Sequence, residues 1–249
     1  MEVTIVRNFG NNNYETRIKG GKLREGALLI FKNNNARIVQ RKENCFFVEF
    51  EKPLHTKDLE ILTPPYIKKN VPEKDYQTVF AKKLGSLAAP TAGLHFTKEL
   101  LNKIQEKGVK IAKVQLNISF ETFLPVRDIH THKTGKEYFM VDKKNAEIIN
   151  TNPKNIIAAG TTVIKCLESC NWEKGKIMPT EGESKLFITP GYIFKTPIKG
   201  MITNFHLPKS SLLLLTAAFA SRERLLKAYD EAVKFKYKFF FFGRCDDDI

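Results

Sequence analysis

Hydrophobic residues in the N-terminal part of the chain occur in short runs that turn-forming residues separate. Five runs are rich in β-branched and aromatic side chains: Val3–Val6, Tyr14–Ile18, Ala27–Phe31, Ala36–Arg41 and Cys45–Phe50. The stretches between them are rich in glycine and asparagine, which tolerate the positive φ angles of tight connections. The pattern predicts a small antiparallel, barrel-like β domain over residues 1–62.

The hydrophobic pattern changes after the proline pair Pro64–Pro65. Two successive prolines remove two backbone donors and stiffen the chain, so this segment favours a domain boundary. Beyond it, apolar strand-like runs are followed by polar turns and then by helical periodicity. This order predicts a larger domain of the mixed α/β class over residues 63–249.

Three junctions between a loop and a helix stand out in the second domain. They are Ala88–Phe96, which leads to the N-cap residue Thr97; Gly160–Thr162, which follows the strand Ile156–Ala159; and His206–Ser211, which follows the strand Met201–Phe205. Loops that leave the carboxyl ends of strands build the ligand site of α/β folds, and helix N-termini there offer N–H groups to oxygen ligands. We therefore expect the three segments to converge in one site.

Composition and charge narrow the class of protein. With 42% hydrophobic residues among 249, the chain can bury a core, which excludes a disordered protein. Its 41 Lys and Arg against 27 Asp and Glu leave a formal charge of +14, which favours a polyanionic partner such as tRNA over a membrane. A lysine-rich solvated surface, as in a thermophile protein, would give the same sum.

Cysteines and apolar runs bear on metal, compartment and membrane. The 4 cysteines form no CxxC pair and have no histidine at metal-ligand spacing, so we expect reduced thiols and no metal site. The apolar run Leu212–Ala220 is far shorter than the ~18 residues that span a bilayer. No basic-then-apolar segment indicates a secretion signal. We expect a cytoplasmic protein.

The block Gly85–Thr97 resembles a known family signature. It matches Gly-Ser-Val-Ala-Ala-Pro-Thr-Ala-Gly-Leu-His-Phe-Thr of the S-adenosylmethionine:tRNA ribosyltransferase-isomerases of queuosine biosynthesis, with Leu87 in place of valine. Further blocks similar to that family follow in the same order: Tyr76–Ala81, Thr122–Val126, Gly160–Val163, Leu167–Ser169, Pro190–Tyr192 and Ile202–Ser210. The resemblance implies a barrel-like α/β catalytic domain beside a smaller, truncated β-barrel-like domain.

The resemblance also implies an activity, a cosubstrate and a partner. The family transfers and isomerises the ribosyl part of S-adenosylmethionine onto a 7-aminomethyl-7-deazaguanine base in tRNA. Adenine and methionine leave, an epoxyqueuosine remains, and no metal takes part. Because the sulfonium acidifies the neighbouring C5′ hydrogens, this chemistry needs a positioned base.

Two histidines are the candidates for that base, His95 and His206. An imidazole with an ordinary pKa near ~6.5 can accept a proton at neutral pH. Either ring could instead only hydrogen-bond the backbone of a packed turn, and His206 could simply satisfy Asn204. The residues leave the choice open.

The resemblance suggests the remaining site residues. Thr91, Gly93, Gly160, Thr161 and Thr162 would surround the ribose or the methionine carboxylate of S-adenosylmethionine. Glu168 would bind ribose hydroxyls, or be a carboxylate on a helix surface. Asn204 would hold the methionine carboxylate, and Lys209 would neutralise a tRNA phosphate. His130 and His132 lie in a polar, lysine-bearing stretch and are expected to be solvated or to face RNA.

Three departures from the family leave other functions open. Asn117–Glu121 stands where the family has His-Val-Gly-x-Gly, so bulk is expected in a loop built for close approach. Phe242–Cys245 replaces Tyr-Gly-Asp-Ala. Met1 aligns inside the family's barrel region, after its Asn-Asp-Thr-Arg-Val block. The chain could therefore be a tRNA-binding paralogue without activity, or one subunit of a split enzyme with a separate N-terminal subunit; its oligomeric state is open.

Overall fold

The structure is a computed structural model, and it describes residues 2–42, 45–54, 76–81, 86 and 88–237. The chain divides into two compact units, Met1–Pro64 and Pro65–Ile249. The proline pair around which a boundary is expected lies outside the described residues, as does the apolar run Phe239–Phe242, which the sequence suggests to be a strand.

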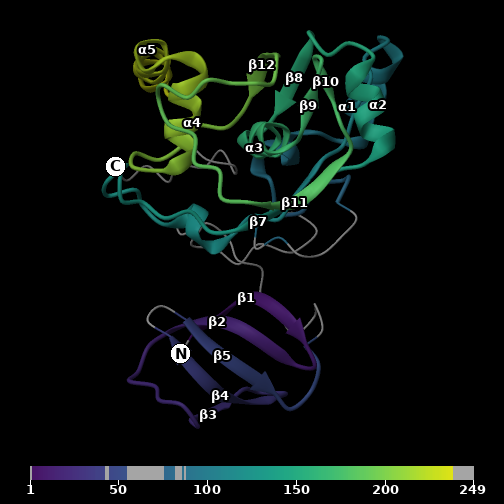
Figure 1. The fold of residues 1–249 in the computed structure, drawn as a ribbon. Coiled ribbons are helices and arrows are strands. Elements are labelled where there is room, and N and C mark those ends of the chain that lie inside the picture. The colour runs from purple at the N-terminus through teal and green to yellow at the C-terminus, as the bar shows by residue number, and fades with distance from the viewer. Residues whose placement is uncertain (1, 43–44, 55–75, 82–85, 87, 238–249) are drawn as a thin grey trace. The chain divides into compact units, whose positions relative to one another are not determined.

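The first unit is a five-stranded antiparallel sheet with the strand order β1-β2-β5-β4-β3 (Figure 1). Its strands are β1 (Glu2–Gly10), β2 (Asn13–Lys19), β3 (Leu28–Ile30), β4 (Asn35–Lys42) and β5 (Cys45–Phe50). All five runs predicted from the hydrophobic pattern form strands, and the sheet curls as a partial barrel does. One face carries the core, which includes Tyr14, Ile38, Val48 and Phe50.

The first hairpin shows why asparagine and glycine lie between the strands. Gly10, Asn11 and Asn12 all have a positive φ, of 81°, 48° and 61°. Such angles are open to glycine and tolerated by asparagine, and they turn the chain tightly enough to pair Gly10 with Asn13. Tyr14 and Thr16 in β2 then point into the core with the period of two that a strand requires.

The second unit has the predicted mixed α/β character. Its helices are α1 (Lys98–Glu106), α2 (Lys143–Asn150), α3 (Thr161–Ser169), α4 (Ser211–Ala220) and α5 (Arg222–Lys234), with the short 3-10 helices η3 (Thr91–His95) and η4 (Phe120–Phe123). Its strands are β6 (Gln115–Leu116), β7 (Glu137–Val141), β8 (Ile156–Ala159), β9 (Trp172–Glu173), β10 (Lys176–Ile177), β11 (Thr180–Ser184) and β12 (Ile198–Ile202).

Among the described residues, these strands form three small sheets. One is antiparallel with the order β11-β7-β6, one is the β10-β9 hairpin, and one is the parallel pair β12-β8. A core of side chains from β7, α2 and α3, including Phe139, Ile149 and Leu167, packs beneath them. A second core joins β8, α3 and α4 through Ala158, Ile164 and Leu215. Helix α3 contributes to both cores and therefore fixes the position of β8.

The helix start signals in the sequence act as predicted. The Thr97 side chain accepts a hydrogen bond from the Leu100 N–H at 3.1 Å, and Ser210 caps Leu213 in the same way. Helix α1 ends before Gly108, whose φ is +79°. Helices α2 and α5 are not predicted by the sequence pattern, although Asp142 caps α2 through the Asn145 N–H.

None of the helices in the described part of the chain combines the length and the apolar character needed to cross a membrane.

Candidate active site

The parallel pair β8-β12 brings the second and third loop segments together. Ala159 pairs with Ile202, so both strands end at the same edge of the sheet (Figure 1). The Gly160 N–H extends the pairing by donating to the Ile202 carbonyl at 2.8 Å. The chain after β8 enters α3 directly, and the chain after β12 forms the loop that leads to α4. These loops leave from the carboxyl ends of adjacent strands, where α/β folds place their ligands.

The first loop segment, which contains η3, packs against the second at Ala92. A β-carbon built on Gly160 would lie 3.6 Å from the Ala92 β-carbon, which is van der Waals contact. Gly160 has a φ of +102°, which a residue with a side chain rarely adopts. A β-carbon on Gly93 would lie 2.8 Å from the Phe80 ring and 2.9 Å from Thr78 Cγ2, so this position excludes any side chain.

The first and third segments meet in a side-chain hydrogen bond between His95 and Asn204. The His95 Nε2 atom lies 2.7 Å from Asn204 Oδ1. With the amide oxygen as acceptor, Nε2 carries the proton of the neutral ring and Nδ1 carries the lone pair. His95 is exposed and Asn204 is half-buried, so the ring stands at the surface of the cluster with a fixed orientation.

The second candidate base, His206, has a different environment. Burial lowers the pKa of its imidazole from 6.5 to about 4, so the ring is neutral at neutral pH. Its Nε2 lies 3.0 Å from Thr203 Oγ1. The Tyr229 hydroxyl accepts a hydrogen bond from the His206 backbone N–H at 2.6 Å and donates one to the His206 carbonyl at 3.3 Å. These contacts tie the loop at His206 to helix α5.

The N-terminus of α3 lies between the other two segments. Gly160 is its N-cap and has no side chain to accept hydrogen bonds from the first turn. Thr161 is buried and Thr162 is half-buried. Backbone N–H groups of a first helical turn that lack a capping side chain suit the oxygens of a carboxylate or phosphate.

Thr91 and Lys209 belong to the first and third segments. Thr91 opens η3 and is half-buried, next to the buried Ala92. Lys209 is exposed and has a φ of +60°, while its carbonyl accepts from the Val126 N–H at 2.7 Å. The ammonium of Lys209 is therefore carried on a fixed turn at the surface.

Glu168 does not lie on the helix surface, which is one of the two alternatives that the sequence leaves open. Its side chain is buried rather than on the helix surface, with only 3% exposure. Its two carboxylate oxygens accept three hydrogen bonds, from the Tyr192 hydroxyl at 2.9 Å, the Lys195 N–H at 3.1 Å and the Thr196 N–H at 2.8 Å. Burial and this carboxylate raise the pKa of Tyr192 to about 12. Three internal donors therefore occupy the Glu168 carboxylate, which joins α3 to the segment around residue 195.

A buried ion pair near the site escapes the sequence analysis. Glu137, in β7, is 2% exposed and pairs with Lys165 of α3. It also accepts from the Thr122 hydroxyl at 2.7 Å and the Ser119 N–H at 3.2 Å. The sequence does carry a sign of this buried charge. Glu137 alternates with the apolar residues Phe139 and Val141 on the inward-facing side of β7.

A small pocket adjoins this ion pair. Its lining includes Glu121, His132, Thr134, Lys165 and Phe187. The His132 ring lies 5.0 Å from the Phe187 ring, and its Nε2 atom is buried with no hydrogen-bond partner among the described residues. The expectation that His132 is solvated or faces RNA is therefore wrong, because the ring packs into the domain.

The altered loop at Asn117–Glu121 is accommodated by a glycine on a distant segment. A β-carbon built on Gly135 would collide with Glu121 Oε2 and would lie 2.5 Å from Ser119 Oγ. The extra bulk that the sequence shows at positions 119 and 121 therefore fills the space beside Gly135. Loop and glycine are complementary, so the bulk does not require the backbone to move apart.

The described residues contain no group of three or more His, Cys, Asp or Glu side chains arranged to hold a metal ion.

Comparison with known proteins shows the family of the chain. A family model described as "Queuosine biosynthesis protein" matches residues 1–246. An S-adenosylmethionine:tRNA ribosyltransferase-isomerase of Sulfurihydrogenibium sp. (strain YO3AOP1) is 44% identical over 268 residues, which cover 98% of this chain and 75% of that protein. A protein of the same name from Desulforamulus reducens is 43% identical over 262 residues, with the same coverage.

A solved structure is also similar to the chain. The crystal structure of S-adenosylmethionine tRNA ribosyltransferase from Thermotoga maritima is 26% identical, with a TM-score of 0.47, over 96% of this chain and 71% of that one. The family match over residues 1–246 and the two sequence relatives are sufficient for the assignment. The chain belongs to the queuosine biosynthesis protein family.

Proposed function

We propose that this chain is an S-adenosylmethionine:tRNA ribosyltransferase-isomerase. It would transfer the ribosyl part of S-adenosylmethionine to the aminomethyl group of 7-aminomethyl-7-deazaguanine in tRNA, with release of adenine and methionine. The observation that carries the proposal is the meeting of three segments at one sheet edge, through Ala92 with Gly160 and His95 with Asn204. The relatives named above bear the name of this activity.

The α3 N-terminus fits the anionic end of S-adenosylmethionine. The methionine carboxylate needs donors, and the first turn of α3 offers backbone N–H groups together with the hydroxyls of Thr161 and Thr162. Thr91 and the backbone at Gly93 would line the ribose, while the side of Gly93 that a Cβ would occupy is filled by Phe80 and Thr78. Lys209, exposed on its turn, would contact a tRNA phosphate.

His95 is the stronger of the two candidates for the base. It would take a proton from C5′, beside the sulfonium that stabilises the resulting carbanion. The C4′–O4′ bond would then break as a C4′–C5′ double bond forms, and the ring oxygen would become a carbonyl at C1′ as adenine leaves. Asn204 fixes the tautomer in which Nδ1 carries the lone pair. A pKa of about 4 makes His206 a weak base at neutral pH, because general bases work best with a pKa near the operating pH. We assign His206 a positioning role in the loop that holds Asn204.

A direct assay tests the proposed function. The full chain is incubated with S-adenosylmethionine and tRNA that contains 7-aminomethyl-7-deazaguanine, and free adenine is measured by chromatography while the nucleoside is weighed by mass spectrometry. We expect adenine release and a matching mass gain only when the precursor base is present. Salt-sensitive tRNA binding without product would contradict the proposal and favour a tRNA-binding paralogue.

A supplied N-terminal polypeptide provides one further arm of the same assay. Product that forms only after its addition would identify a split enzyme with a separate N-terminal subunit. Since tRNA is a cytoplasmic substrate, the proposed function carries a cytoplasmic location with it.

A further inference from the structure

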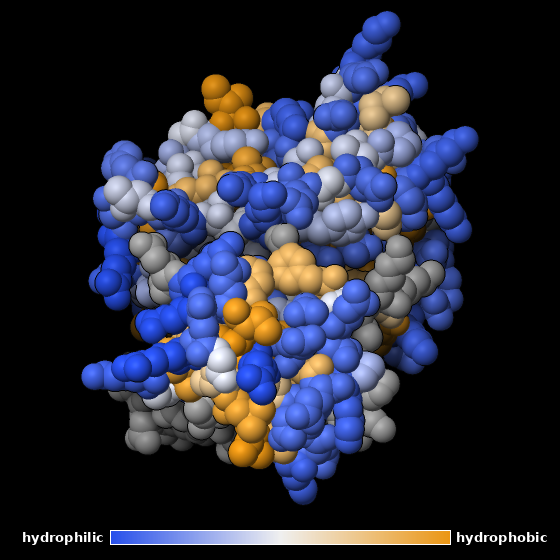
Figure 2. All heavy atoms as spheres, turned by 60° about the horizontal axis from the view of Figure 1, so that its bottom comes forward, coloured by the Kyte–Doolittle hydropathy of each residue, from blue (hydrophilic) through white to orange (hydrophobic). Residues whose placement is uncertain are grey.

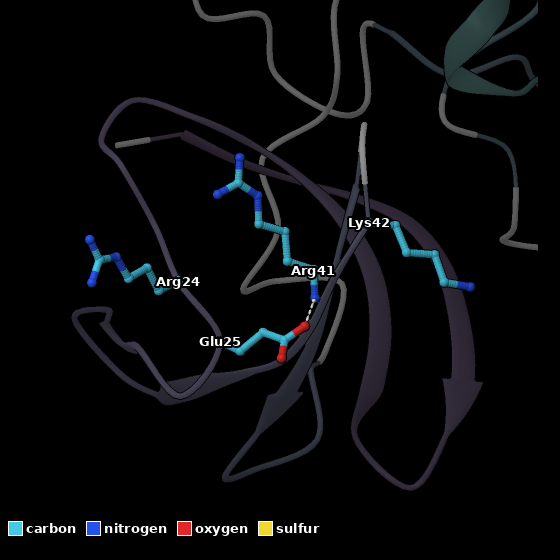
Figure 3. Close-up of a pocket in the computed structure, with 4 residues that line it drawn as sticks. All are labelled: Arg24, Glu25, Arg41 and Lys42. Atoms are coloured by element: carbon cyan, nitrogen blue, oxygen red, sulfur yellow. Dashed lines mark hydrogen bonds between the residues drawn. The ribbon is translucent and has the colours of Figure 1, made fainter.

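Three cationic side chains gather around one surface hollow of the five-stranded sheet unit. The hollow is lined by Arg24, from the connection between β2 and β3, by Arg41 and Lys42, at the end of β4, and by Glu25 (Figure 3). All four residues are exposed. Three cations against one carboxylate leave the hollow with a net positive charge, which suits an anion.

The Arg41 side chain is held in place by its neighbours. Its Nη1 donates to the Leu23 carbonyl at 3.2 Å, and its guanidinium lies 5.8 Å from the centre of the Phe46 ring. Its backbone N–H donates to Glu25 Oε1 at 2.8 Å, which Figure 3 marks with a dashed line. The Glu25 carboxylate is thus bound by the backbone. Among the described residues, no carboxylate forms an ion pair with Arg24, Arg41 or Lys42.

The three cationic side chains lie on two sides of β4. Figure 3 shows the guanidinium groups of Arg24 and Arg41 on the same side of β4, with Lys42 directed to the opposite side. Successive residues of a strand face opposite sides, so this arrangement follows from the pleat. A phosphate could therefore meet two guanidinium groups on one side, while Lys42 serves the other.

Aromatic rings lie beside Lys42. Its ammonium is 4.9 Å from the centre of the Phe47 ring, and Phe47 stacks on Phe9 with 5.8 Å between ring centres. Phe9 is 52% exposed, although a phenylalanine ring gains free energy from burial. Figure 2 shows hydrophobic residues among hydrophilic ones on the face that it presents.

We propose that Arg24, Arg41, Lys42 and Phe9 form a tRNA-binding surface on the five-stranded sheet. Arg24 and Arg41 bind backbone phosphates, because the planar guanidinium matches the geometry of phosphate oxygens. Lys42 neutralises a further phosphate, and the exposed part of the Phe9 side chain packs against an unpaired base. The choice of tRNA as the polyanion rests on the proposed function; the cations and the exposed ring favour RNA over an acidic protein.

The test measures binding of a precursor-containing tRNA to the full chain, by fluorescence anisotropy at several KCl concentrations and without S-adenosylmethionine. The double variant Arg24→Ala/Lys42→Ala removes two exposed cations. Lys32→Ala is the matched control. Lys32 is also an exposed lysine, but it follows β3, and β3 pairs with the start of β4, whereas Arg41 lies near the end of β4. Phe9→Leu keeps an apolar side chain and removes the ring. Circular dichroism and urea unfolding verify that each variant folds.

The double variant is expected to bind about tenfold more weakly, and the slope of log K against log[KCl] should become shallower by about one to two. Phe9→Leu should weaken binding about threefold or more without changing the slope, because stacking releases no counterions. Lys32→Ala should behave as the wild type. If the double variant and the control bound tRNA with equal affinity and equal salt dependence, the proposed binding surface would be refuted.

Adenine release by the wild type, measured separately, keeps the two proposals apart. A wild type that releases adenine, with a double variant that binds tRNA normally, would refute the surface and leave the function standing. Impaired binding by the double variant, with a wild type that releases no adenine, would support the surface and refute the function.

Discussion

His95 and Asn204 are 109 positions apart in the chain, yet His95 Nε2 lies 2.7 Å from Asn204 Oδ1. The contact joins the loop of η3 to the loop that follows β12. It also fixes which nitrogen of the imidazole carries the proton, and thus which one can accept another. The orientation of the proposed base therefore depends on the residue that follows the parallel strand pair.

Replacing His95 by alanine should lower kcat for adenine release by about 10²- to 10⁴-fold, the range typical of general-base catalysis. Because His95 is exposed, the free energy of unfolding should change little. Asn204→Ala removes only the orienting acceptor, so we expect a smaller loss, on the order of tenfold. Chromatography of adenine, together with urea unfolding, measures both effects. Near-normal turnover by His95→Ala would exclude it as the base.

The buried imidazole of His206 predicts a pH dependence of stability. Its pKa is about 4 in the folded chain and near 6.5 in the unfolded chain, so the unfolded state binds the proton more readily. The stability that neutral His206 contributes is present above pH 6.5 and is lost as the pH falls toward 4. The loss amounts to roughly 2–3 kcal/mol relative to a variant that cannot titrate.

Urea unfolding of the wild type and of His206→Gln at pH 7 and pH 4.5 measures this effect. Carboxylates titrate in both proteins, so the difference between the two isolates the histidine. We expect the wild type to lose its advantage at the lower pH. A difference that stays constant across this range would show that His206 titrates normally in the folded chain.

Glu168→Ala should destabilise the chain by about 2–5 kcal/mol, because it leaves buried donors of Thr196 and Lys195 without an acceptor. Glu173→Ala is the control, since Glu173 is an exposed carboxylate in β9, the strand that follows α3. Chemical unfolding measures both. If Glu168→Ala raised the KM for S-adenosylmethionine while stability stayed unchanged, a ribose-binding role would replace the structural one.

Gly135→Ala should destabilise the chain by about 1–3 kcal/mol, because the new methyl group meets Ser119 Oγ and Glu121 Oε2. Ser119→Ala removes the less mobile of these two atoms. The Ser119 hydroxyl has no hydrogen-bond partner among the described residues, so this single change should cost little. In a double-mutant cycle, Ser119→Ala should recover part of the loss. Strict additivity would show that the two positions are not complementary.

Much of the fold could be predicted from local signals. The five strands of the first unit follow from β-rich runs between glycine and asparagine turns, and α1 follows from Thr97 and Gly108. These signals act within a few residues. The local pattern does not predict helices α2 and α5, because charged residues dominate α5 and the apolar face of α2 is short. Pairing between β7 and β11 joins segments about forty residues apart, and a local pattern does not report such a partner.

The site divides in the same way. The meeting of the second and third loops could be predicted, because parallel strands end at a common edge. The first loop follows neither of these strands, and it joins the others through the tertiary contacts of Ala92 and His95. The sequence suggests that Glu168 binds ribose or lies on the surface. Its actual partners, Tyr192 and Thr196, belong to a segment whose path the sequence does not reveal. Glu137 and Lys165 were missed for the same reason, because each is satisfied by a residue on another element. The proposed roles of Thr91, Thr161 and Lys209 stay predictions.

Equilibrium binding of radiolabelled S-adenosylmethionine most directly tests whether the three segments form one site. We predict saturable binding by the wild type, weakened at least fivefold by a single substitution in each segment: Thr91→Val, Thr162→Val and Asn204→Ala. Lys174→Ala, at an exposed turn of the β9-β10 hairpin, should bind as the wild type does. Unchanged affinity in all three variants would contradict the account, because the cosubstrate would then bind elsewhere.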